Sequence, residues 1–172
     1  MGTTLEQVAA HEAGHAILGL AAGWQLRNIT TQPGKHPESF LPGMPDATLA
    51  TNFVLPLPQI EARLTYLIAA GGMAGEIVLH GKYHLPGAGD DLAKLKAVNL
   101  SDHEIEGLIQ IATRALNANL SLWKKTKRRM LSGLERKQAV LVEGIPINTL
   151  FKHTGKRFTD FAGLDKILPL ES

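Results

Sequence analysis

The sequence predicts a mainly α protein with a small β-sheet, which is an α+β fold. Long stretches with apolar residues at helical spacing follow helix-capping patterns, and they occupy most of the chain. Two short stretches near 26–31 and 48–55 are instead rich in strand-forming residues and are bounded by Pro and Gly. A His-Glu-x-x-His pattern lies in the first predicted helix, and the rest of the chain is expected to be organised around it.

The length of 172 residues is enough for one domain with a real hydrophobic core. We expect a single domain over 1–172, with a candidate metal site and the sheet within 1–100, a helical part at 101–152 and a tail at 153–172. The 44% hydrophobic and 20% charged residues are fractions typical of an ordinary globular protein. The sequence has no Cys, so any metal must be bound by His and carboxylate side chains.

Charge and hydropathy argue against two classes of partner. The net charge of +2 is too near balance to indicate nucleic-acid binding, and the basic run at 124–129 is interpreted as a solvated helix face. No apolar run is long enough to cross a bilayer, and the N-terminus lacks the pattern of a signal peptide. We therefore expect a soluble, cytoplasmic protein that binds neither nucleic acid nor membranes.

The first helix is predicted over about 4–22. Thr4 with Gln7, or the pair one residue earlier, can form a capping box at its start, and Gly23 is a natural stop. Small residues are frequent in this helix, so another stretch of backbone can approach it closely.

The first helix contains His11-Glu12-Ala13-Gly14-His15. His11 and His15 lie one turn apart on the same helix face, so both imidazoles can reach one metal ion. In zincin-type helices with this pattern, two His hold zinc and the Glu, here Glu12, acts as general base. The pattern needs a third ligand from elsewhere in the chain.

The two predicted strands, 26–31 and 48–55, are expected to form a small sheet beside this helix. The exposed edge of such a sheet can hold an extended peptide by strand addition. The candidate peptide-binding residues lie in the second strand and are Thr51, Asn52, Phe53 and Val54.

A second long helix is predicted over 59–80, and its middle is rich in glycine. Gly71, Gly72 and Gly75 in a helix interior should cost about 2–3 kcal/mol relative to Ala. A chain tolerates that cost when another backbone passes very close. The first helix is the expected partner.

Residues 81–91 are predicted to be a loop, and a further helix is expected to start at Leu92. Asp90 and Asp91 would then stand at a helix N-terminus, where capping alone could explain both acids.

The rest of the chain is predicted to be helical. Ser101 with Glu104 forms another capping box, and apolar residues recur at helical spacing over 105–116 and 120–134. A short helix is expected near Pro146, and 152–172 is expected to be a loosely packed tail.

Spacing alone leaves the third ligand open. The form His-Glu-x-x-His-x-x-Gly-x-x-His is excluded, because Leu18 and Ala21 occupy the required Gly and His positions. Glu76 in the glycine-rich helix, or one of Asp90 and Asp91, could complete the site.

The sequence resembles the peptidase domain of the FtsH family of zinc proteases in three blocks, which occur in the family's order. They are His11–Ala16 for the metal helix, Gly71–Glu76 for the family's Gly-Gly-x-Ala-Ala-Glu-Glu helix, and Gly87–Leu92 for its Gly-Ala-x-Asn-Asp-Leu segment. The resemblance implies that Asp91 is the third ligand and that Asp90 replaces the family's Asn.

Two other acids are expected beside the ion. Glu76 and Asp90 are candidates for side chains that contact the ligands without binding the ion themselves. The chain also departs from the family, because it has no Gly-x-x-x-x-Gly-Lys loop and no membrane segment, and Gly75 and Ile77 replace an Ala and a Glu.

The resemblance implies a zinc-dependent endopeptidase that binds one Zn²⁺ per chain through His11, His15 and Asp91. The expected substrates are unfolded or flexible polypeptides, cleaved without ATP. A delivery partner and a homo-oligomer are both left open. The alternative is a zinc-stabilised protein-interaction module that derives from a protease and no longer cleaves.

Overall fold

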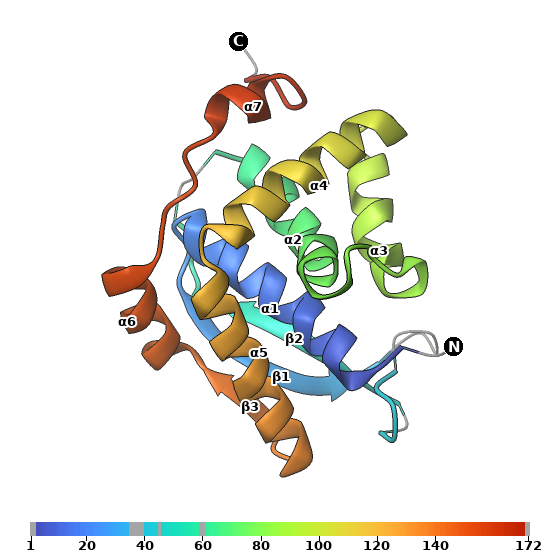
Figure 1. Cartoon of the computed structure of the whole chain (residues 1–172), viewed down its shortest axis with the longest axis vertical. Coiled ribbons are helices and arrows are strands. Elements are labelled where there is room, and N and C mark those ends of the chain that lie inside the picture. Colours follow the sequence, from blue (N-terminus) through green and yellow to red (C-terminus); the bar gives the residue numbers. More distant parts are fainter. Residues whose placement is uncertain (1–2, 35–39, 45, 59–60, 171–172) are drawn as a thin grey trace.

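A computed structural model describes residues 3–34, 40–44, 46–58 and 61–170 (Figure 1). In this part of the chain the elements are α1 (Leu5–Ala21), β1 (Leu26–Pro33), β2 (Ala47–Phe53), α2 (Arg63–His80), α3 (Leu85–Lys96), α4 (Asp102–Asn117), α5 (Leu120–Glu135), β3 (Val140–Glu143), α6 (Gly144–Thr154) and α7 (Phe161–Asp165). Helices predominate and the strands form one small antiparallel sheet, so the predicted α+β class is confirmed.

Helix α1 lies at the centre of the fold, packed between α2, α5 and the sheet (Figure 1). Its start follows the predicted capping box: the Gln7 N–H donates to the Thr4 hydroxyl at 3.1 Å, and the Thr4 N–H donates to the Gln7 side chain at 2.8 Å. Gly23 follows the helix with φ of 101°, a left-handed conformation that suits glycine. Nearly every residue of α1 from Ala9 onward is buried, which explains its small side chains.

The sheet has the strand order β2-β1-β3, and both predicted strands are confirmed within two residues at each end. Strand β2 therefore lies at an edge, with Thr51 opposite Ile29 of β1. The third strand, β3, was not predicted, and it brings the sheet beyond the expected limit of 1–100. Four residues carry no periodicity of their own, so only the pairing with β1 defines this strand.

Helix α2 covers most of the second predicted helix and ends at Gly81, whose φ is 83°. The predicted first residues, Gln59 and Ile60, lie outside the described residues. Among the described residues, no helix combines the length and the apolar character that crossing a membrane requires.

The predicted loop at 81–91 is confirmed only for 81–84, and the prediction is wrong for 85–91. Helix α3 begins at Leu85, with Pro86 in its first turn, where the missing N–H of proline costs nothing. Asp90 and Asp91 therefore lie in the second turn of α3 and do not cap it. The glycines of this segment suggested a loop, but the helix tolerates them.

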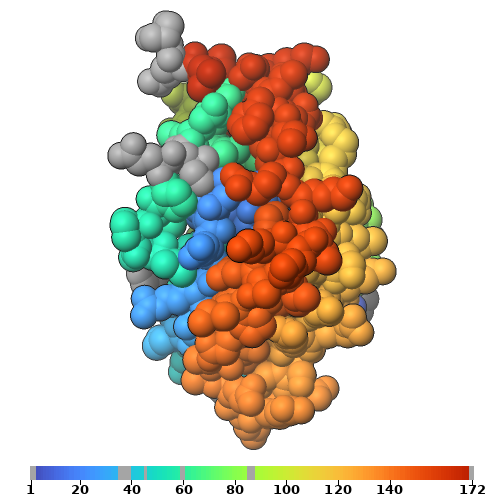
Figure 2. All heavy atoms as spheres, turned by 90° about the vertical axis from the view of Figure 1, so that its left-hand side faces the viewer, coloured from blue at the N-terminus to red at the C-terminus, as the bar shows by residue number. Residues whose placement is uncertain are grey.

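Residues 155–168, here called the C-terminal segment, are better packed than the sequence predicted. Phe158 is buried, its N–H donates to the carbonyl oxygen of Ala21 at 2.9 Å, and Leu164 is fully buried. Figure 2 shows this segment, in red, lying across the blue N-terminal part of the chain. The predicted helices and the Ser101 capping box are confirmed in α4, α5 and α6.

Candidate metal centre

Helices α1 and α2 touch through backbone, as the glycine run predicted. A Cβ added to Gly14 would lie 2.0 Å from the carbonyl oxygen of Gly71. A Cβ added to Gly75 would lie 2.1 Å from the carbonyl oxygen of Ala10. Neither distance leaves room for any side chain, so glycine is required on both helices.

The same contact makes room for a histidine ring. A Cβ on Gly72 would lie 2.3 Å from Nε2 of His11, because the imidazole lies against the bare backbone of α2. His11 is only 8% exposed. Glycine at position 72 therefore leaves the space that the His11 ring occupies.

Each imidazole ring uses its Nδ1 for a hydrogen bond to α2. His15 Nδ1 lies 2.7 Å from the carbonyl oxygen of Ile68, which can only accept, so this nitrogen carries the proton and donates. His11 Nδ1 donates in the same way to a carboxylate oxygen of Glu76 at 2.8 Å. Both neutral rings then present Nε2 as a free lone pair.

The two free nitrogens converge with a carboxylate from α3. Nε2 of His11 and Nε2 of His15 lie 3.1 Å apart, and Oδ2 of Asp91 lies 2.9 Å from the first and 3.3 Å from the second. With both rings neutral, all of these atoms are acceptors, so the group is stabilised by a metal ion or by added protons among them. Two imidazoles and one carboxylate are a donor set that fits Zn²⁺.

The pKa values show how strongly the site favours positive charge. Burial lowers the pKa of His11, but hydrogen bonds with Asp91 and Glu76 outweigh it and raise this pKa to about 10. Burial also lowers the pKa of His15, but the charge of Asp91, its hydrogen bond and the charge of Glu12 together outweigh burial and raise this pKa. Burial opposes ionisation of Asp91, yet both imidazoles hold its pKa well below the usual range. Without a metal, protons take the place of the cation.

Glu12 lies beside the rings on α1. Its carboxylate and the ligand atoms of His11 and His15 all lie within 4.8 Å of one another. The carboxylate accepts a hydrogen bond of 2.7 Å from the Thr51 hydroxyl of β2. The arrangement places a proton acceptor next to a candidate metal position.

The structure brings together five of the predicted site residues: His11, Glu12, His15, Glu76 and Asp91. Asp90 differs from them, because it lies on an exposed part of α3.

The four predicted peptide-binding residues differ among themselves. Phe53 packs against Gly19 and against the ring of Trp24, and the Thr51 hydroxyl contacts Glu12, so both side chains point toward α1. Asn52 donates to side chains of β1 on the other face of the sheet, and Val54 follows the end of β2.

Two contributors were not predicted from the sequence. The carbonyl of Ile68 orients His15 through backbone, which leaves no signal in the identity of the residue. The Thr51 hydroxyl reaches Glu12 across a contact between residues 39 positions apart. Gly72 was detectable only as part of the glycine run.

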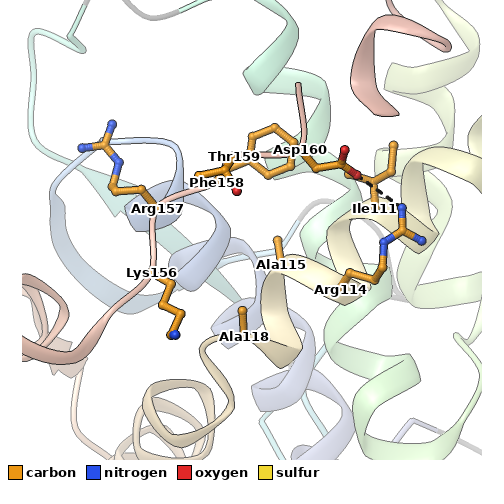
Figure 3. A pocket seen from close by; sticks show the side chains of 9 residues that line it. All are labelled: Ile111, Arg114, Ala115, Ala118, Lys156, Arg157, Phe158, Thr159 and Asp160. Atoms are coloured by element: carbon orange, nitrogen blue, oxygen red, sulfur yellow. Dashed lines mark hydrogen bonds and ion pairs between the residues drawn. The ribbon is translucent and has the colours of Figure 1, made fainter. Parts of the chain in front are cut away.

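A cavity of about 180 Å³ lies between α4 and the C-terminal segment (Figure 3). Arg114 pairs with Asp160 at 3.4 Å, whereas Lys156 and Arg157 point away in different directions (Figure 3). Because the cationic groups do not converge, this cavity lacks the features of an anion site.

Comparison with known proteins gives one relative. Over 93 residues the chain is 36% identical to an ATP-dependent zinc metalloprotease FtsH of Lactococcus lactis subsp. lactis. The match covers 52% of this chain but only 12% of the relative, so the chain spans a small part of that protein's length. No protein-family model matches the chain, and no solved structure matches it. The similarity supports an FtsH-related region and a protease-related function.

Proposed function

We propose that this chain is a zinc-dependent endopeptidase acting on unfolded or flexible polypeptides. The observation that carries the proposal is the convergence of the two Nε2 atoms and the Asp91 carboxylate within 3.3 Å. The similarity to an FtsH zinc metalloprotease supports the same chemistry. The chain itself has no Gly-x-x-x-x-Gly-Lys loop, so cleavage is proposed to proceed without ATP.

One Zn²⁺ would be held by His11, His15 and Asp91, and it would polarise the scissile carbonyl and acidify a water molecule. Glu12 accepts the proton of the attacking water and later delivers it to the leaving amine. Glu76 and the Ile68 carbonyl keep the two rings oriented, each through its Nδ1–H. No role is proposed for Asp90, which is exposed on α3.

The substrate is proposed to add as a strand along the free edge of β2, beside Glu12. Strand addition requires an extended chain, which excludes folded segments from the site. Cleavage of folded proteins would then need a delivery partner or a homo-oligomer that unfolds them.

The test is cleavage of a labelled, permanently unfolded polypeptide by the wild-type protein, with chelator and with zinc restored. Glu12→Gln is the matched variant, because it keeps the shape of the side chain and removes its basicity. We expect chelation to abolish cleavage and Glu12→Gln to reduce kcat by about 100-fold or more, with zinc content unchanged.

Two outcomes would contradict the proposal. Equal cleavage by Glu12→Gln would rule out the assigned base. A zinc-loaded wild-type protein that cleaves nothing would favour the alternative, a zinc-stabilised interaction module that no longer acts as a protease.

A further inference from the structure

The hydroxyl of Thr51 makes a short contact with the candidate base. Its Oγ1 lies 2.7 Å from Oε2 of Glu12 and 3.3 Å from the main-chain oxygen of the same residue. A hydroxyl has a single proton to donate, and the shorter bond to a charged acceptor is the stronger one. Among the described residues, no other side chain donates a hydrogen bond to the Glu12 carboxylate.

The position of Thr51 is fixed by the sheet rather than by α1. Thr51 pairs with Ile29 of β1, and Ile29 is fully buried in the core. The neighbouring Asn52 donates to Asn28 and Thr30 on the opposite face of the sheet. A Thr side chain is also restricted at χ1, so its hydroxyl has a defined direction.

Glu12 has no comparable restraint of its own. Its side chain has three rotatable bonds and is only partly buried, so an unrestrained carboxylate would sample several rotamers. A general base acts only within hydrogen-bond reach of the proton that it removes. Catalysis by Glu12 therefore requires that its carboxylate be held in the right position, as well as that it be present.

We propose that Thr51 is a positioning residue, whose hydroxyl holds the Glu12 carboxylate beside His11 and His15. The proposal rests on the proposed function and changes the expected role of Thr51, from a contact with the peptide to alignment of the base. It assigns the inner face of β2 to the catalytic machinery, while the free edge of the same strand remains the proposed peptide site.

The test uses two substitutions at one position. Thr51→Val keeps the branched shape and removes the hydroxyl, whereas Thr51→Ser keeps the hydroxyl. Thr149→Val is the matched control, because Thr149 lies on an exposed face of α6, outside β2, and its hydroxyl donates to the carbonyl oxygen of Ile145 in the same helix.

We expect Thr51→Val to lower kcat by about tenfold to 100-fold, because a misaligned Glu12 loses part of the rate enhancement of general-base catalysis. KM should stay within about twofold, because substrate binding is not involved. Thr51→Ser should recover most of kcat, and Thr149→Val should behave as the wild type. Zinc content and thermal unfolding of all variants check that the fold and the metal site persist.

A readout independent of activity is the position of Glu12 in crystal structures of the wild type and both Thr51 variants. We expect the carboxylate to keep its place with Thr or Ser and to leave it with Val. An unmoved carboxylate in Thr51→Val would overturn the proposal, and so would a raised KM with unchanged kcat, which would indicate a peptide contact. If the wild type cleaves nothing, the proposed function fails, while the crystal structures still decide whether Thr51 positions Glu12.

Discussion

Glycine allows close packing at two places in this molecule, with different consequences. Between α1 and α2, Gly14 and Gly75 face backbone atoms at 2.0–2.1 Å from an added Cβ. Between α4 and the C-terminal segment, a Cβ on Gly107 would meet Cδ1 of Ile167 at 3.0 Å. The backbone atoms at the first contact cannot move aside, whereas the atom that faces Gly107 is the end of a flexible side chain.

The polar contacts between α1 and α2 differ in the same way from those that hold the C-terminal segment. Glu76 is 2% exposed and holds His11 in the tightly packed contact between α1 and α2. Arg63 pairs with Glu61 and Asp165 and so attaches the C-terminal segment to α2, but the Asp165 side chain is 54% exposed. Solvent screens an exposed pair and weakens its contribution. Rigid packing is therefore concentrated where the candidate metal ligands lie.

The largest effect is expected for Gly14→Ala, which would break the contact between α1 and α2. The new Cβ would lie 2.0 Å from the Gly71 carbonyl, so the helices must separate. We expect the free energy of unfolding to fall by about 3 kcal/mol, measured by chemical denaturation of the metal-free protein. Gly89→Ala is the control, because an added Cβ there meets nothing within 4 Å. Equal stability of Gly14→Ala and the wild type would refute the close contact.

Gly72→Ala should act on the metal more than on the fold. The new Cβ would collide with the His11 ring, which can rotate away from its place, whereas backbone cannot. We expect zinc affinity to fall by about 100-fold, measured by competition with a chromogenic chelator. The loss of stability in the metal-free protein should be smaller than for Gly14→Ala. Unchanged zinc affinity would show that His11 does not bind the ion.

Proton release on zinc binding tests the electrostatics of the same region. The pKa of His11 is raised to about 10, so at pH 7.5 its ring is protonated in the metal-free protein and must lose that proton to bind zinc. We expect zinc to release about one to two protons per chain in weakly buffered solution, measured by a pH indicator.

The direction follows from a pKa that is raised above the assay pH, because a proton bound before zinc arrives must leave. Glu76→Gln replaces a charged hydrogen-bond acceptor that raises the pKa of His11 with a neutral one, so zinc binding to this variant should release fewer protons. Zinc binding without any proton release would contradict the raised pKa.

The smallest effect is expected for Gly107→Ala in the second region. Ile167 can shift its terminal methyl group, and alanine favours helix over glycine, so the two terms offset each other. We expect a change in the free energy of unfolding within about 1 kcal/mol and no change in zinc affinity. A loss as large as that of Gly14→Ala would mean that the two regions do not differ.

Elements with a local signal were predicted well. The capping boxes at Thr4 and Ser101 were confirmed, because they depend on residues three positions apart. Strand β3 was not predicted, because a strand of four residues is defined only by its pairing with β1. The start of α3 was not predicted, because a glycine-rich sequence is more typical of a loop than of a helix. The C-terminal segment was expected to be loose, since its anchor, Arg63, lies about 100 residues away in the sequence.

The sequence by itself determined the pair of histidines with the adjacent glutamate, since helical periodicity places them together on one turn. It also indicated that glycines in α2 allow a close contact. Spacing could not choose among Glu76, Asp90 and Asp91, and only the packing of α1, α2 and α3 decided which acid meets both rings. The physical reason is that side-chain convergence across separate helices depends on interhelical distance, and that distance is set by tertiary contacts.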